Sequence, residues 1–452
     1  MTQQNDFSKG NIPRTITRLA IPMILAMLVN ALYSVVDRIY IGHLSGVGQT
    51  ALTGIGLCYP ITMAIAAFSY LVGNGGGPLT SILRGAKDDE GAEKVLGNSI
   101  TLLVLFGILV PLICFLIQKP VLYLFGASDA TYPYAREYIT IYLSGSLPVM
   151  LTLGLNPFLN AQGFTRTGMM TVLIGAVCNI VLDPLFIFVF GLGIKGAAIA
   201  TVISQTLSAA FVLYFLHYKA EYRIRFLSKT ELTACGEDAK NIVSLGTAGF
   251  IMQLTNSLVT ICANNVLSVT GGDVYISVMT IISSVRQMVE TPIYAITEGS
   301  SPIISYNYGA RRPQKVRQAG ITMAVLALIY TLLIWSVILA APRFLIGIFS
   351  SDQALMTDTV PAMKLYFAAF IFMLLQYVGQ TIFKALNKKK YAIFFSILRK
   401  VIIVVPLTYI LPYALNIGPN GVFMAEPVSN IIGGSLCFIV MLSTVLPELK
   451  RM

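Results

Sequence analysis

The chain has 452 residues, of which 56% are hydrophobic and only 11% are charged, and it carries a formal net charge of +11. Soluble domains carry roughly 25% charged residues, so this composition excludes a protein that faces water on all sides. Its six cysteines show no C-x-x-C pair and no metal-ligand spacing, which indicates free structural thiols.

Apolar runs of about 20 residues recur along the chain, and each is long enough to cross a hydrocarbon core of about 30 Å. We expect no cleavable signal peptide, because residues 1–14 are polar and the first apolar run is too long for one. The runs predict twelve membrane-spanning helices, at 15–42, 50–74, 95–117, 133–158, 168–190, 196–217, 241–269, 275–300, 318–340, 360–384, 391–415 and 420–446.

Lysine and arginine alternate between the two sides of these twelve spans. If the N-terminus is cytoplasmic, the outer loops hold only Lys119, Lys195 and Arg343, with Arg38 and Arg136 near outer helix ends. This is the positive-inside pattern, and it predicts a multi-pass protein of the cell membrane with both termini in the cytoplasm. The net positive charge therefore reflects the orientation of the chain in the membrane, and no nucleic-acid partner is expected.

The two halves of the chain are copies of one template. A shift of 224 residues places PLTSILRGAK, which starts at Pro78, on PIISYNYGAR, which starts at Pro302. We expect an N-terminal lobe at 1–217, a cytoplasmic linker at 218–240 and a C-terminal lobe at 241–452. Each lobe would hold six helices, with a pseudo-two-fold axis along the membrane normal and a cleft between the lobes, as in two-lobed transporters. Gly85 and Gly309 are expected to cap helices with positive φ.

Two acids lie at membrane depth in the first lobe, Asp37 in the first span and Asp183 in the fifth. Ionisable groups at this depth cost at least about 2.5–3.5 kcal/mol each and usually mark ion paths. Helical spacing places Tyr33 one turn before Asp37 and Asn30 one turn earlier. Asn179 stands four residues before Asp183, on the same helix face.

The residues around Asp183 add further oxygen ligands. Pro184 cannot donate a hydrogen bond to the Ile180 carbonyl, and Thr201 adds a hydroxyl if the sixth span packs beside the fifth. Such hard oxygen ligands suit Na⁺, or a proton held between carboxylates. The alternative is that Asp37 only anchors a helix end while Asp183 supports a proline kink. The second lobe has no acid at the equivalent positions, which favours a functional role.

The second lobe carries a different charged set, which we regard as candidates for the substrate site. Arg286 and Glu290 lie one turn apart and are as well suited to an internal ion pair as to a substrate contact. The other members are Glu298, Arg399, Lys400 and Glu426. No histidine lies in the middle of a span, and no H-E-x-x-H motif is present, so we do not expect an intramembrane enzyme.

Four segments together resemble the multidrug and toxic compound extrusion (MATE) family, and the MepA-like bacterial branch in particular. They are SVVDRIYIGHLSG, RGAKDDEGAEK, the N-x-x-x-D-P of the fifth span, and SPIISYNYGARR. The resemblance implies twelve helices in two bundles and export of cationic amphipathic drugs driven by inward H⁺ or Na⁺. It also implies a first-lobe cation site that would fall on Asp37, Asn179, Asp183 and Thr201, with Tyr33 nearby.

One departure from the family pattern favours coupling in the first lobe, because the seventh and tenth spans lack the acids that some members use. We therefore expect a bacterial secondary antiporter in which H⁺ or Na⁺ neutralises the Asp37–Asp183 pocket. We expect no bound cofactor other than this coupling ion, H⁺ or Na⁺. The first helix would then bend at Pro22 and displace the drug. Its partners would be small cationic drugs and the lipid bilayer, and it would act as a monomer. The alternative is a flippase for lipid-linked saccharides, whose anionic cargo would need a basic cleft.

Overall fold

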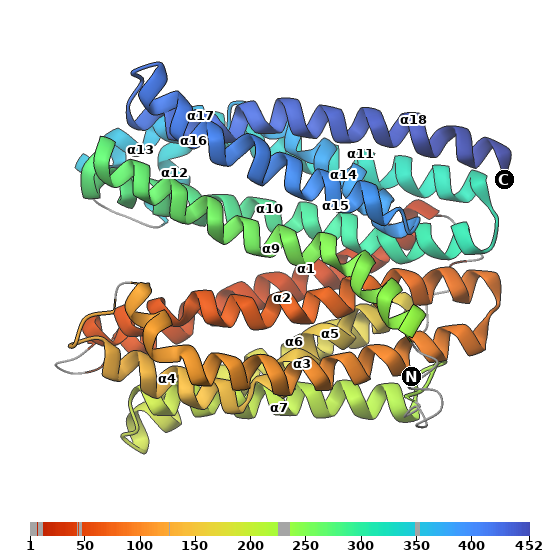
Figure 1. Ribbon diagram of the computed structural model, residues 1–452, viewed down its shortest axis with the longest axis horizontal. Coiled ribbons are helices and arrows are strands. Elements are labelled where there is room, and N and C mark those ends of the chain that lie inside the picture. Colours follow the sequence, from red (N-terminus) through yellow and green to blue (C-terminus); the bar gives the residue numbers. More distant parts are fainter. Residues whose placement is uncertain are drawn as a thin grey trace. The chain divides into compact units, whose positions relative to one another are not determined.

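The structure is a computed structural model that describes residue 7 and residues 12–42, 44, 48–125, 127–224, 236–348 and 353–452. The described residues form helices joined by short turns, without any strand. Figure 1 shows long helices lying side by side within each half of the chain. The expectation of an all-α membrane protein is confirmed.

The described residues of the first half form eight helical elements. They are α1 (Ile12–Gly42), α2 (Gly48–Ala86), α3 (Asp89–Leu124), α4 (Tyr132–Ser144), α5 (Ser146–Ala161), α6 (Thr165–Pro184), the π-helix η1 (Leu185–Val189) and α7 (Ile194–Tyr218).

Twelve helical elements lie in the part of the second half that the structure describes. They are α9 (Gly236–Thr270), α10 (Gly272–Gly309), α11 (Pro313–Ala340), α12 (Pro342–Gly347), α13 (Gln353–Tyr366), α14 (Phe370–Ala385), α15 (Lys389–Ile397), the π-helix η2 (Leu398–Val404), α16 (Val405–Ala414), α17 (Pro419–Ser429), the π-helix η3 (Asn430–Gly434) and α18 (Ser435–Arg451).

Nine of the described helical spans are long and apolar enough to cross a membrane, or up to 11 if each of two bent helix pairs is one span. The helix that completes the twelve expected spans is α10. It is long enough at 38 residues, but its charged side chains, Arg286, Glu290 and Glu298 among them, lower its hydropathy. The cost of those charges is met by ion pairs inside the protein, described below.

Two expected helices are broken rather than continuous. The expected helix 133–158 consists of α4 and α5, which meet at Gly145 with a bend of 59°, and 360–384 contains the bend of 50° between α13 and α14. A Cβ on Gly145 would lie 2.4 Å from the Val202 side chain on α7. Close packing against α7 therefore requires glycine at the first break.

The duplication is visible in the backbone as well as in the sequence. Nearly all described residues with positive φ form pairs separated by 224 or 225 positions. The pairs are Lys87 with Arg311, Gly163 with Asn387, Gly191 with Asn416, and Gly193 with Gly418. Because left-handed conformations are costly outside glycine, asparagine and aspartate, their recurrence shows that the two copies kept the same turns.

The expected helix caps at Gly85 and Gly309 are wrong. Gly85 lies inside α2 and Gly309 is the last residue of α10, and neither has positive φ. The left-handed residue comes two positions later, at Lys87 and Arg311. Backbone bonds from Asp88 N to Leu83 O and from Arg312 N to Asn307 O close the turn, so the left-handed cap lies two residues beyond the glycine in each copy.

The described chain divides into two compact units, and the boundaries fall inside helices. The first unit holds residues 25–250, and the second holds Phe7, residues 12–24 and residues 251–452. The first turns of α9 thus pack within the first unit, where a Cβ on Gly75 would lie 2.0 Å from the Ile242 carbonyl oxygen. In the second unit, Gly299 of α10 similarly contacts Ala20 of α1.

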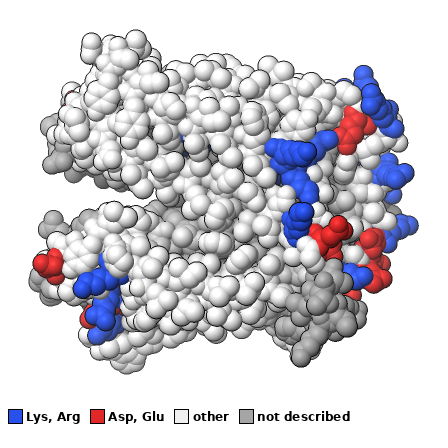
Figure 2. Space-filling model, in the orientation of Figure 1, with Lys and Arg blue, Asp and Glu red and all other residues white. Residues whose placement is uncertain are grey.

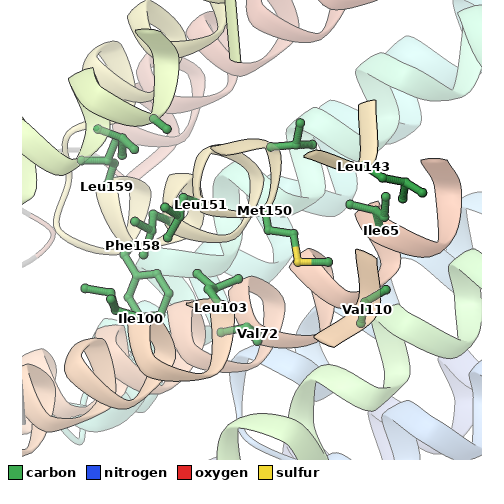
Figure 3. Close-up of a cluster of buried hydrophobic side chains, with 14 of the residues drawn as sticks. Ile65, Val72, Ile100, Leu103, Val110, Leu143, Met150, Leu151, Phe158 and Leu159 are labelled. Carbon is green, nitrogen blue, oxygen red and sulfur yellow. The ribbon is translucent and has the colours of Figure 1, made fainter. Parts of the chain in front are cut away.

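The core of the first unit lies between α2, α3, α4 and α5. Val72, Leu103 and Phe158 are fully or almost fully buried there, and Figure 3 shows their side chains pointing toward one another. On the face drawn in Figure 2, charged side chains gather near the ends of the helices, while the flanks between them are uncharged. This distribution matches helices that cross a hydrocarbon layer.

The start of the expected linker is bound to the first unit. The Tyr222 N–H donates to Gln162 Oε1 (2.8 Å), the Gln162 amide donates back to Tyr222 O (3.2 Å), and the Tyr222 hydroxyl donates to Asp89 Oδ1 (2.8 Å). Arg84 pairs with Glu221 at 3.0 Å. Burial and the Asp89 carboxylate raise the pKa of Tyr222, so its hydroxyl remains a donor at neutral pH. Residues 225–235 lie outside the described residues.

Candidate functional site

The centre of the candidate site is a hydrogen-bonded pair on α6. Asp183 is 0% exposed and Asn179 is 2% exposed. The Asn179 amide Nδ2 donates to Asp183 Oδ1 over 3.1 Å, as the four-residue spacing on one helix face predicts. A carboxylate and an amide thus lie together in the buried interior of the first unit.

Thr201 on α7 joins this pair, as expected if α6 and α7 pack together. The Asn179 Nδ2 atom lies 3.4 Å from Thr201 Oγ1 and donates to it. Small side chains permit the close approach of the two helices, because Gly175 of α6 faces Ser208 of α7. Ser208 also donates its hydroxyl to the Thr171 carbonyl of α6 at 2.9 Å. The structure therefore brings Asn179, Asp183 and Thr201 into one cluster.

Asp37 approaches the cluster from α1. Its side chain is half-buried, and its carboxylate interacts electrostatically with that of Asp183. The two acids of the first unit are thus neighbours, although they are 146 residues apart in sequence. Asn30 lies exposed on α1, and the Tyr33 side chain lies outside the described residues, so its place beside Asp37 remains a prediction.

Two oxygens in the cluster, Asn179 Oδ1 and Asp183 Oδ2, are buried and have no hydrogen-bond partner among the described residues. The buried Ser204 Oγ of α7 also has none among these residues. Buried polar groups are normally paired, so oxygens of this kind are suited to bind a cation or a proton. Ser204 lies one turn after Thr201 on α7, and sequence analysis missed it because a lone serine in an apolar helix gives no distinct signal.

The composition of the cluster restricts which ion it fits. Among the described residues, no group of three or more His, Cys, Asp or Glu side chains is arranged to hold a metal ion. The cluster's carboxylate, amide and hydroxyl oxygens are hard ligands of the kind that bind Na⁺ or hold a proton. Na⁺ would be held by Asp37, Asn179 and Asp183.

The backbone beside Asp183 departs from α-helical geometry. α6 ends at Pro184 and continues into the π-helix η1, where the Phe190 N–H donates to Leu185 O. Because proline has no N–H, the Ile180 carbonyl receives no hydrogen bond from residue 184. π-Helical turns in α-helices frequently occur at functional sites, so a helix irregularity and the buried acid coincide here.

The charged candidates of the second unit form a network rather than isolated groups. Arg286 bonds to Glu290 through Nε, to Glu426 Oε1 through Nη2 at 3.1 Å, and to the Tyr366 hydroxyl through Nη1 at 2.7 Å. Arg399 donates to Glu426 Oε1 at 3.0 Å and to Asn430 Oδ1 at 2.6 Å. We call Arg286, Glu290, Arg399, Lys400 and Glu426 the second-unit network.

Glu298 belongs to a separate ion pair. Its carboxylate bonds to the Lys384 ammonium of α14, and both side chains are largely buried. Nearer the C-terminus, Glu448 pairs with Lys388 and accepts a hydrogen bond from Tyr308 at 2.7 Å. The substrate candidates Arg286, Glu290, Glu298 and Arg399 are therefore all engaged inside the second unit.

The neutral members of these clusters were not predicted from the sequence. Tyr377 donates to Glu290 at 3.2 Å, and Tyr366 and Asn430 accept from the two arginines. Nothing in their local sequence separates them from the other tyrosines and asparagines of the chain. Lys384 of α14 is only 5% exposed, because its ammonium group pairs with the Glu298 carboxylate inside the protein.

Comparison with known families gives a repeated match. The MatE family model matches residues 22–185 and again residues 248–410. The two matches correspond to the two copies of the repeat, and together they cover more than half of the chain.

Individual relatives match over almost the full length. The multidrug export protein MepA of Staphylococcus saprophyticus is 25% identical over 435 residues, which is 95% of this chain and 93% of that protein. An FAD transporter of Shewanella oneidensis is 23% identical over 446 residues, covering 97% and 96%.

Solved structures share the fold. The outward-facing conformation of a multidrug resistance MATE family transporter of the MOP superfamily has a TM-score of 0.90 at 23% identity, with 100% of both chains covered. A MOP superfamily transporter from Pyrococcus furiosus has the same TM-score at 24% identity, also with full coverage. On the repeated family match and the shared fold, the chain belongs to the MatE (MATE) family of membrane transporters.

Proposed function

We propose that this protein is a secondary antiporter of the bacterial cell membrane that exports cationic amphipathic compounds in exchange for H⁺ or Na⁺. The observation that carries the proposal is the buried cluster of Asp183, Asn179 and Thr201, with the Asp37 carboxylate beside it. Two neighbouring carboxylates at membrane depth are costly when both are charged. Binding of H⁺ or Na⁺ relieves that cost, and release restores it.

The local backbone offers a way for this cluster to move a helix. Pro22 lies inside α1 and is buried, and it removes one backbone hydrogen bond from the helix that carries Asp37. Loading of a cation changes the repulsion between Asp37 and Asp183 and so favours a different position of the α1 segment beyond Pro22. Multidrug export by the MepA relatives supports a xenobiotic cargo.

The alternative, a flippase for lipid-linked saccharides, has weaker support. An anionic pyrophosphate would need basic side chains free to bind it. Arg286, Arg399 and Lys400 are instead each bonded to Glu426. A cationic cargo is also attracted by the acids of the first unit, whereas an anionic cargo is repelled by them.

Transport by the purified full chain in proteoliposomes tests the proposal. A cationic dye should be driven across the bilayer by a proton gradient or by a sodium gradient, and the gradient that works identifies the coupling ion. Asp37→Asn should abolish this transport. If the wild type moves the dye under neither gradient but flips a labelled pyrophosphate lipid, the antiporter proposal is wrong.

A further inference from the structure

The second-unit network carries one more positive than negative charge. It contains the cations Arg286, Arg399 and Lys400 and the anions Glu290 and Glu426. Arg399 is 6% exposed, Lys400 2% and Glu426 4%. An unbalanced charge is costly in such an interior, because the ions have lost water and a partner carboxylate is missing. The network therefore favours any change that removes one positive charge.

The geometry makes Glu426 the shared acceptor of all three cations. Its Oε1 atom lies 3.1 Å from Arg286 Nη2, 3.0 Å from Arg399 Nη1 and 3.1 Å from Lys400 Nζ. Its Oε2 atom accepts only from Lys400, at 3.3 Å, among the bonds found in the described residues. Two guanidiniums therefore already compensate Glu426 without the ammonium.

The chemistry of the three cations is not equivalent. A guanidinium keeps its proton under all conditions in proteins, whereas a buried lysine loses its proton readily. Glu290 and Glu426 each accept a bond from an arginine, so each carboxylate already has a guanidinium partner. Lys400 is thus the one member of the second-unit network whose charge can change, and its loss of a proton makes the network neutral.

We propose that the second-unit network is a second proton-exchange site, separate from the acids of the first unit, in which Lys400 gains and loses the proton. Deprotonation breaks one Nζ–H bond, leaves a neutral amine that still donates to Glu426, and releases the proton to solvent. Uptake reverses these steps. The groups that face Lys400 are Glu426 of α17, Arg286 and Glu290 of α10, and Arg399 of η2.

The local backbone directs both basic side chains to one acceptor. Arg399 and Lys400 are consecutive, and consecutive residues of an α-helix point about 100° apart. Here they lie in the π-helix η2, where the Val405 N–H donates to Lys400 O, and both side chains reach Glu426. Beyond Glu426, the Arg286 and Glu290 side chains are 16% and 15% exposed, so this edge of the network is the more accessible one.

A neutralising anion is the competing explanation, and the burial disfavours it. Such an anion would have to reach Arg399 and Lys400, whose side chains are only 7% and 3% exposed. A proton needs no cavity, since it moves along hydrogen bonds. The consequence for transport rests on the proposed antiport: a cationic cargo repels the protonated network and so promotes proton release from Lys400.

Proton counting on the purified full chain in detergent tests the site without any cargo. Between about pH 9 and about pH 5, a range below the ordinary lysine pKa, the wild type should bind one more proton than Lys400→Arg. Lys400→Met should also bind one proton fewer than the wild type. It leaves two cations and two anions in the second-unit network, so this variant should fold even if the arginine variant does not. Lys390→Arg, at an exposed position of α15, should match the wild type.

Equal proton uptake by the wild type and both Lys400 variants would overturn the proposal. So would stoichiometric binding of chloride or inorganic phosphate that depends on Lys400, because an anion would then balance the charge. A second measurement uses tetraphenylphosphonium, a permanent cation, in proteoliposomes. Lys400→Met should lower its accumulation about tenfold per pH unit of gradient, while Asp183→Asn should abolish it. Failure of the wild type to move this cation would contradict the antiport proposal and leave the proton count as an independent result.

Discussion

Replacement of Asp183 by asparagine separates a coupling role from a structural one. The amide keeps the shape of the side chain and can still accept the 3.1 Å bond from Asn179. That bond becomes neutral, which lowers its value from about 1.5–3 to about 0.5–1.5 kcal/mol. Loss of the buried charge offsets this by about 2.5–3.5 kcal/mol. We therefore expect Asp183→Asn to be as stable as the wild type or slightly more stable.

Transport should respond in the opposite direction. One proton crossing one pH unit releases about 1.4 kcal/mol, which sustains a gradient of roughly tenfold in a monovalent drug exchanged one for one. Asp183→Asn cannot exchange that proton, so the steady-state dye gradient in proteoliposomes should fall to equilibrium. Asp129→Asn, in the exposed turn before α4, is the matched control. A variant that kept the wild-type gradient would show that Asp183 only supports the Pro184 region.

Three further predictions concern other parts of the chain. Asn179→Ala removes the donor to both Asp183 and Thr201 and should weaken sodium- or proton-driven dye uptake while leaving dye binding, measured by fluorescence anisotropy, in place. Gly193→Ala places an L-residue at a φ of +56° and should lower the free energy of unfolding, measured by thermal unfolding, by about 1–3 kcal/mol. Gly347→Ala, in open space, should be neutral, and equal costs would contradict the backbone argument. Lys384→Met alone leaves the buried Glu298 carboxylate without its partner and should destabilise the protein by about 3–5 kcal/mol. The double variant that also carries Glu298→Met should regain most of the wild-type melting temperature.

Much of the fold follows from local pattern, because the bilayer imposes one rule on every span. An apolar run of sufficient length must form a helix there, since no water is present to bond its backbone groups. The helix breaks at Gly145 and between α13 and α14 could not be predicted from local pattern, because they depend on packing against other helices. The positive φ at Lys87 and Arg311 also escaped prediction, as glycine two positions earlier gave the stronger local signal.

Part of the candidate site could also be predicted from local pattern. Helical periodicity places Asn179 and Asp183 on one face, and their bond is present. Thr201 required the additional condition that α6 packs beside α7, which the small residues of these helices satisfy. Ser204 offered no signal in sequence.

The positions of the spans, the register of the repeat and the side chains that share a helix face can all be predicted from the sequence, because they depend on residues close together in the chain or on direct comparison of its two halves. Which charged side chains meet depends instead on the packing of the helices. Glu426 binds Arg286 from 140 residues away, and Lys384 binds Glu298 from 86 residues away. Such pairs depend on which helices pack together and at what height. Periodicity along one helix carries no information about the face that its neighbour presents.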